Sequence, residues 1–186
     1  MPSLTSCAKR SQNRRRSQDD TRVHPATVPD HAANLYWLAF LLTGDREASV
    51  DAAVEALDSS DGNAFFSAWM LAWSRKVVIA KALAAIRQEL AESALRLAST
   101  RDSNYPAPPR NWSLAPGASK IQLERALLAI DTLPRCVLLL SLFEGLSLDD
   151  ATVLLDVDRG LVRKAQAVAL QQLTSNLAGM AVAARV

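Results

Sequence analysis

Residues 133–173, near the C-terminus, carry the pattern that most limits how this chain can fold. They read LPRCVLLLSLFEGLSLDDATVLLDVDRGLVRKAQAVALQQL, which predicts a helix, a short helix, a tight turn and a longer helix. Asp156 and Asp158, with Gly160 behind them, mark the turn, because an aspartate there can cap the next helix by accepting hydrogen bonds from its free amides. This is the pattern of a helix-turn-helix, which can lay its second helix in a DNA major groove.

A helical pattern also runs through residues 30–98. The segment AANLYWLAFLLTG is apolar nearly all round and stops at Gly44, as a helix buried among others does. A second helix is expected from Arg46, capped by Asp45, and a long apolar-rich helical stretch is expected from about Ala64. No stretch alternates convincingly as a strand does, so the predicted fold class is all-α.

Prolines divide the helical pattern into two blocks. Four of them lie within residues 99–119, where proline removes amide donors and disfavours helix in the preceding residue. The sequence therefore predicts two small helical domains, residues 30–98 and 120–178, joined by a linker over 99–119. A further helix is expected to begin at Leu133-Pro134, with the proline at the tolerated first position.

Charge is unevenly distributed along the chain, although the net charge is only +2. Residues 1–29 hold six basic and two acidic side chains and predict a flexible basic tail, which is either a solvated leader or an arm for nucleic acid. Residues 30–100 sum to −3 and residues 120–177 to −1. Both blocks are thus mildly acidic, so only a local cluster of cations could bind phosphate.

The sequence argues against a membrane protein and against an enzyme. The longest apolar run, Leu35 to Leu42, is too short to cross a bilayer, and the N-terminus lacks the apolar stretch of a signal peptide, so a cytoplasmic protein is expected. No catalytic motif occurs, and the two histidines, His24 and His31, are expected to be solvated in or beside the tail. Cys7 and Cys136 give no metal-ligand or disulfide spacing, so no cofactor or metal is predicted.

The second block resembles region four, the promoter-binding domain, of bacterial RNA polymerase sigma factors, and most closely their extracytoplasmic-function group. The resemblance rests on Leu133-Pro134, on Glu144-Gly145-Leu146-Ser147, and on Asp150-Ala151 followed by Leu154-Leu155 and Gly160. The first block is similar to region two, the polymerase-binding domain, through Leu41-Leu42-Thr43-Gly44-Asp45, Asp51-Ala52-Ala53-Val54-Glu55 and Trp69-Met70 with Arg75. The two matches follow the order of the family.

The resemblance implies a helical adaptor that binds core RNA polymerase and directs it to promoter DNA. An anti-sigma factor is a further partner that the resemblance allows. In the first block, Asp51 and Glu55 would face the polymerase, unless they are simply a solvated acidic face. Trp73, Arg75 and Lys76 fall where the family holds the promoter strand; Trp69 and Trp73, four residues apart, are either a base-stacking platform or part of the core. In the second block, the residues expected to face DNA are Arg159, Arg163, Lys164, Ala167 and Gln171.

Several positions depart from the family pattern. Ala165 and Val168 stand where members commonly have basic residues, which predicts a weaker grip on phosphate, and Leu161 replaces a threonine. Gln166 replaces an apolar residue and needs a hydrogen-bond partner or a slight helix rotation. The segment from Asp51 to Trp69 is short, which makes strand opening the least secure inherited function. Two alternatives therefore stay open: a degenerate sigma-like interaction module, and a helix-turn-helix regulator without initiation activity.

Overall fold

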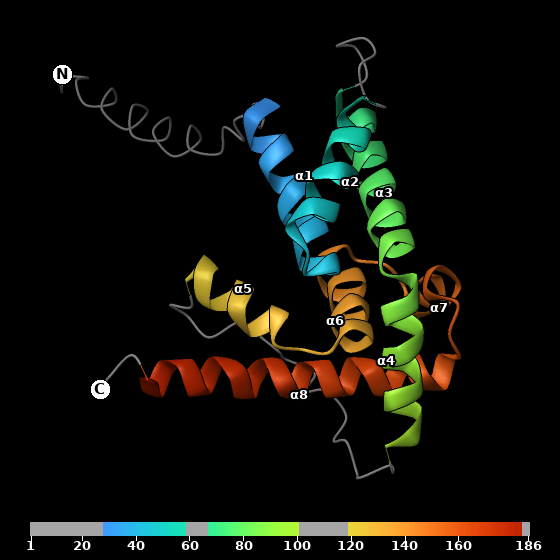
Figure 1. Ribbon diagram of the computed structural model, residues 1–186, viewed down its shortest axis with the longest axis vertical. Coiled ribbons are helices and arrows are strands. Elements are labelled where there is room, and N and C mark those ends of the chain that lie inside the picture. Colours follow the sequence, from blue (N-terminus) through green and yellow to red (C-terminus); the bar gives the residue numbers. More distant parts are fainter. Residues whose placement is uncertain (1–27, 59–66, 101–118, 184–186) are drawn as a thin grey trace, which may run out of the picture.

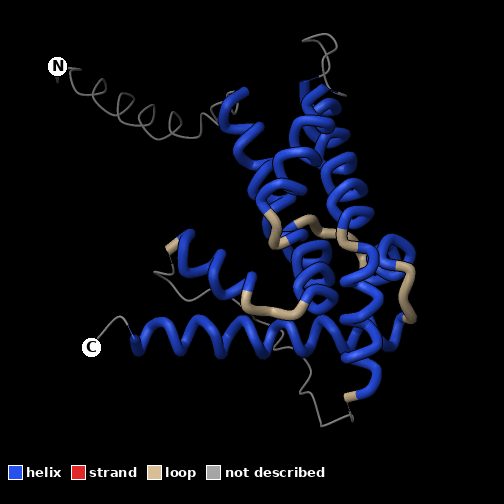
Figure 2. The backbone as a smooth tube through the Cα atoms, viewed as in Figure 1, coloured by secondary structure: helices blue, strands red, loops and turns tan. Residues whose placement is uncertain are grey.

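Helices form every regular element in residues 28–58, 67–100 and 119–183, the residues that the computed structural model describes (Figures 1 and 2). No strand occurs within these ranges, so the all-α class is confirmed. The elements are α1 (Val28–Thr43), α2 (Arg46–Asp58), α3 (Ser67–Ala85), α4 (Arg87–Ser99), α5 (Lys120–Leu128), α6 (Thr132–Leu138), the π-helical turn η2 (Leu139–Phe143), α7 (Leu148–Leu155) and α8 (Arg159–Ala183).

Helices α1, α2 and α3 pack on one another and form the upper part of the molecule in Figure 1. Helix α1 ends where the sequence predicts: the amide of Gly44 donates to the carbonyl of Phe40 at 2.8 Å, and Gly44 has a φ of 73°, a conformation that suits glycine. Asp45 Oδ1 accepts a hydrogen bond from the amide of Ala48 at 2.8 Å, so the predicted cap of α2 is also confirmed. At its other end α1 begins at Val28, inside the range expected for the tail.

The long helical stretch expected from Ala64 is two helices, which run almost end to end in Figure 1. The helix breaks at Ile86, whose backbone has φ −103° and ψ 16°, and Ile86 is buried. Neither glycine nor proline marks this break, so no local sequence signal predicts it. The expected start at Ala64 lies outside the described residues, which resume at Ser67.

The second block begins with a well-capped helix, α5. Ser119 Oγ accepts from the amide of Gln122 at 3.2 Å, and the side chain of Gln122 accepts from the amide of Ser119 at 2.9 Å, a reciprocal capping box. Helix α6 starts earlier than predicted. Asp131 is its N-cap, so Pro134 is the third helical residue and not the first; it is tolerated because amides of the first turn have no partner within the helix.

Helix α6 is the centre of the fold. Every residue from Thr132 to Leu140 is buried, as expected for a segment that is apolar almost all round. It contacts α1 and α4 of the first block and α8 of the second, and one continuous apolar cluster extends through both blocks. The two predicted domains therefore pack directly against each other. No helix among the described residues combines the length and apolar character needed to cross a membrane.

Candidate nucleic-acid interface

The predicted helix-turn-helix is formed by α7, residues 156–158 and α8. Asp158 Oδ1 accepts hydrogen bonds from the amides of Gly160, at 2.7 Å, and Leu161, at 3.2 Å, which confirms an aspartate cap on α8. Asp156 ends α7 in the left-handed conformation, with φ 53°. Ser147 caps the start of α7 by accepting from the amide of Asp150 at 3.0 Å. Local hydrogen bonds thus fix the start of each of the two helices.

The residues expected to face DNA divide into three groups. Arg159, Arg163 and Gln171 are exposed on α8, and Arg159 Nε lies 3.1 Å from Asp149 Oδ1 in an ion pair that solvent weakens. Ala167 is half-buried between them. Lys164 is also half-buried, and its Nζ donates to the carbonyl of Thr100 at 2.7 Å, at the carboxyl end of α4, where a cation is favoured.

The positions where the chain departs from the sigma-factor pattern lie on the inner side of α8. Ala165 and Val168 are buried, so neither position lies on the exposed face of α8, and the weaker grip on phosphate expected from them stays a prediction. Gln166 Nε2 donates to Ser141 Oγ at 3.2 Å, which supplies the partner that its polar side chain needs. Leu161 packs against the core.

Trp69 and Trp73 form an exposed aromatic pair on α3. Their rings stack with centroids 5.7 Å apart and planes within 11° of parallel, and the residues are 61% and 45% exposed. The core interpretation of these two tryptophans is therefore wrong. An exposed ring face can stack on an unpaired base, and the exposed Lys76 lies on the same helix.

Arg75 pairs with a residue that the sequence reasoning did not connect to it. Its guanidinium binds the carboxylate of Glu144, which follows η2 in the second block, and these hydrogen bonds raise the pKa of Arg75. Beside it, His31 Nε2 lies 2.9 Å from Ser74 Oγ. His31 is half-buried in α1, so its expected place in a solvated tail is wrong, and burial together with the charge of Arg75 lowers its pKa.

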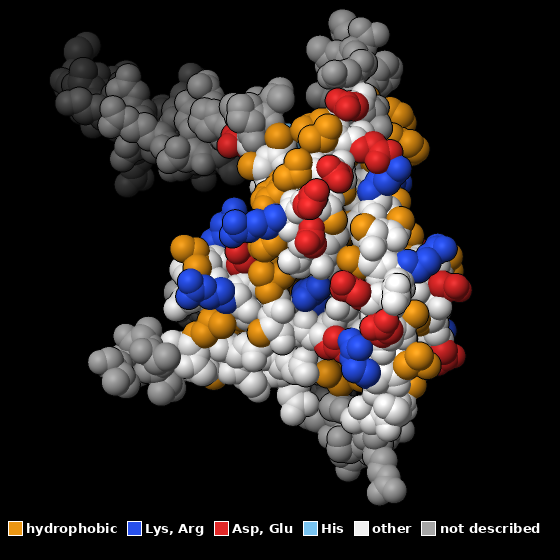
Figure 3. All heavy atoms as spheres, in the orientation of Figure 1, with side chains coloured by type: hydrophobic (Ala, Val, Ile, Leu, Met, Phe, Trp, Pro, Cys, Tyr) orange, Lys and Arg blue, Asp and Glu red, His pale blue; other side chains and the backbone are white. Residues whose placement is uncertain are grey.

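The acidic residues expected to bind polymerase lie on the solvent side of α2. Asp51 and Glu55 are exposed one turn apart, and Glu55 forms an ion pair with Lys81 of α3. Glu47 and Asp58 are exposed on the same helix, and Figure 3 shows acidic side chains gathered over this part of the molecule. We call Glu47, Asp51, Glu55 and Asp58 the acidic stripe.

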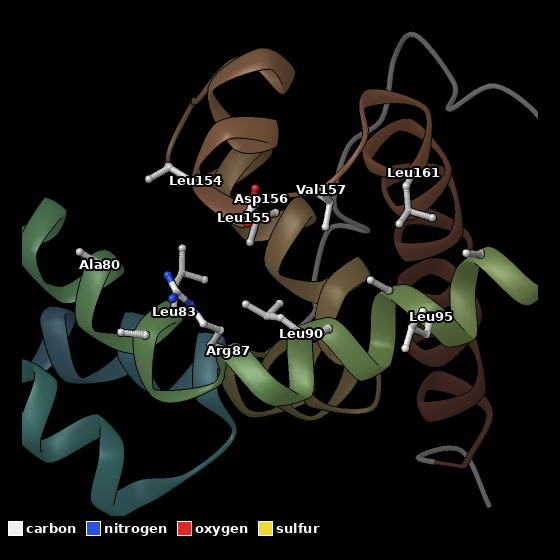
Figure 4. A pocket seen from close by; sticks show the side chains of 14 residues that line it. Ala80, Leu83, Arg87, Leu90, Leu95, Leu154, Leu155, Asp156, Val157 and Leu161 are labelled. Carbon is white, nitrogen blue, oxygen red and sulfur yellow. The ribbon is translucent and has the colours of Figure 1, made fainter.

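An apolar groove separates the first block from the helix-turn-helix (Figure 4). It has a volume of about 640 Å³ and lies between α4, represented by Leu90 and Leu95, and the turn region, represented by Leu154 and Val157. The two blocks pack together mainly through α6, with further contacts between α4 and α8 and between α1 and α5, but leave a gap beside α7.

Cys136 is a free thiol buried in α6, and burial raises its pKa to about 12, so it is protonated and inert at neutral pH. Within the part of the chain that the structure describes, no three histidine, cysteine, aspartate or glutamate residues are grouped so that they could hold a metal ion. Comparison of the chain with protein-family models, with curated proteins and with solved structures gives no match.

Proposed function

We propose that the protein is a sigma-factor-like transcription initiation protein, which binds core RNA polymerase in the cytoplasm and directs it to promoter DNA. The observation that carries the proposal is the capped helix-turn-helix, whose second helix leaves Arg159, Arg163 and Gln171 exposed. Arginine can bind guanine edges or phosphates through two parallel hydrogen bonds, and glutamine can pair with adenine.

Two surfaces of the first block support the same proposal. The acidic stripe on α2 suits a basic surface of a protein partner, because complementary charges steer association and fix orientation. The stacked, exposed Trp69 and Trp73 suit unpaired bases, with Lys76 nearby on α3 to track a phosphate backbone.

The first test is whether the full chain retains core RNA polymerase in a pull-down. The Asp51→Asn, Glu55→Gln double variant should retain less polymerase, whereas Glu89→Gln, Glu92→Gln, which removes two exposed charges from α4, should retain as much as the wild type. Equal retention by both variants would remove the acidic stripe from the proposal, and no retention by the wild type would reject the proposal itself.

The second test concerns DNA. Arg163→Ala should weaken binding of the polymerase complex to a cognate promoter by about 1 to 3 kcal/mol if the arginine contacts a base through two hydrogen bonds. Arg125→Ala, which removes an exposed cation from α5, is the matched control and should bind as the wild type does. Unchanged affinity for Arg163→Ala would show that α8 does not enter the DNA major groove through this face.

A second candidate function is a sigma-like interaction module that holds polymerase or an anti-sigma factor without reading DNA. The observation that favours it is that Arg75 and Lys164 are both engaged by groups of this chain. Such a module would bind core polymerase but start no transcription on any upstream region of its own genome. Its DNA binding would also show a shallow salt dependence, since each phosphate contact contributes about 0.9 to the exponent.

A further inference from the structure

Glu144 holds Arg75 across the boundary between the two blocks. Arg75 Nε donates to Glu144 Oε2 at 3.0 Å, and Arg75 Nη2 donates to Glu144 Oε1, so one edge of the guanidinium is filled by one carboxylate. The side chain of Glu144 is 9% exposed and that of Arg75 is 45% exposed. The acid is therefore the fixed partner, and the arginine is the one that faces solvent.

The backbone around Glu144 keeps its side chain in place. Glu144 directly follows η2, and its amide donates to the carbonyl of Leu139 at 3.0 Å, the i to i−5 bond of a π-turn. Gly145 then turns the chain with a φ of 70°, and the amide of Leu146 donates to the carbonyl of Leu140 at 3.0 Å. Isolated π-turns are rare in proteins, and those that do occur often lie at functional sites.

A carboxylate and a phosphate compete for the same edge of an arginine. Arginine binds both through two parallel charge-assisted hydrogen bonds, so one guanidinium edge cannot hold both anions. We propose that Glu144 is an internal competitor of nucleic acid at Arg75, an autoinhibitory contact that masks this cation until phosphate displaces the carboxylate. The inference rests on the proposed function together with the expectation, from the family resemblance, that Arg75 contacts the promoter strand.

Two further carboxylates of the second block bond to the first block, but at residues for which no role in nucleic-acid binding is proposed. Glu124 Oε2 accepts from Trp37 Nε1 at 3.2 Å, and Asp131 Oδ1 lies 2.8 Å from Arg96 Nη2. Glu124→Gln therefore matches Glu144→Gln in charge and in crossing the boundary, while leaving Arg75 masked.

The test compares the full-length wild type with these two variants. The probe is a fluorescein-labelled single-stranded DNA of mixed sequence, titrated in low salt with and without core RNA polymerase. We expect Glu144→Gln to tighten DNA binding about three- to tenfold, the scale of a partly exposed charge-assisted contact, and Glu124→Gln to stay within about twofold of the wild type. The charge-swapped Arg75→Glu, Glu144→Arg chain should re-form the pair and show no gain.

A measurement without DNA tests the bridge itself. The urea midpoint of an Arg75→Gln, Glu144→Gln double variant should fall by less than the sum of the two single shifts, because both single variants break the same pair. Additive shifts would overturn the proposal. Unchanged DNA affinity for Glu144→Gln would also overturn it, provided that the wild type binds DNA. Neither of these two results contradicts the proposed function. If neither wild type nor variant binds the probe, alone or with polymerase, the proposed function fails and the competitor role fails with it.

Discussion

Arg135 is the residue on which the centre of the fold most depends. Only 6% of it is exposed, and its guanidinium donates to the carbonyls of Leu128, Ile130 and Leu42, at distances of 3.2 to 3.4 Å, while Nε has no partner. These carbonyls lie at or beside the carboxyl ends of α5 and α1, where helices leave acceptors unpaired and favour a cation. One side chain therefore completes the ends of two helices from different blocks.

Arg135→Met should lower the free energy of unfolding by about 3 kcal/mol, because it removes the guanidinium donors of three carbonyls while keeping most of the apolar stem. Of the three, the carbonyl of Leu42 keeps a weak donor, the thiol of Cys136. Arg125→Met, the same change at an exposed site of α5, should cost less than about 0.5 kcal/mol. Urea unfolding followed by circular dichroism measures both. Similar losses for the two variants would mean that the buried guanidinium contributes no more than a surface arginine.

His31 should make stability depend on pH between neutrality and mild acid. Burial and the charge of Arg75 lower its pKa in the folded state, whereas the unfolded chain takes up the proton near the usual value of about 6.5. The unfolded state then binds more protons than the folded state. The contribution of His31 to the free energy of unfolding is therefore complete above about pH 6.5 and is lost as the pH drops towards the folded-state pKa.

Comparison of urea midpoints at pH 7.5 and pH 5.5 checks this dependence. His31→Gln should show a smaller loss between the two pH values than the wild type, since glutamine can still bond to Ser74 Oγ but does not titrate. Equal losses would show that other groups set the acid response.

The start of α8 tests the turn at the level of a whole element. A Cβ built on Gly160 would lie 2.8 Å from Asp158 Oδ1, the oxygen that caps the helix, whereas a Cβ on Gly179 of the same helix would meet nothing within 4 Å. Gly160→Val should therefore displace the cap and cost about 1 kcal/mol, and Gly179→Val should stay within about 0.5 kcal/mol of the wild type. Thermal unfolding of the two variants gives the comparison. If Gly160→Val is as stable as Gly179→Val, the Asp158 cap contributes little to the stability of the turn.

Local signals explain which elements could be predicted from the sequence. The end of α1 at Gly44 and the Asp45 and Asp158 caps each depend on a side chain or a φ value within a few residues, and all were predicted. The break at Ile86 and the π-turn before Glu144 have no glycine or proline within the helical run, so residue type alone does not predict them.

The candidate site was less predictable because its contacts cross long stretches of chain. Arg75 and Glu144 are 69 residues apart in sequence, and Lys164 and Thr100 are 64 apart. Side-chain type and helical spacing placed Arg163 and Gln171 on an exposed face correctly, yet they could not show which cations another element occupies. The tryptophan pair illustrates the same limit, since helical spacing alone suited both a core and an exposed platform.

Across the whole molecule, α6 and the contacts of Ser93 join the two blocks into one packed unit. Ser93 is buried in α4; its Oγ donates to Asp131 Oδ2 at 2.8 Å and accepts from the amide of Leu133 at 2.9 Å. Because one apolar cluster runs through both blocks, we expect a single unfolding transition for the full chain and not one for each block. Separate, independently stable domains would instead give two transitions.

Ser93→Ala distinguishes these outcomes, because it removes both hydrogen bonds of the Ser93 hydroxyl across the boundary. It should lower the free energy of unfolding by about 1 to 3 kcal/mol. If the blocks unfold together, hydrogen exchange in α2 and in α8 should accelerate by the same factor, since both then report the same global opening. Ser175→Ala, at an exposed site of α8, should leave both rates unchanged. Acceleration confined to one block would show that the blocks are stable apart. The boundary would then be a docking surface that binding to a partner could open.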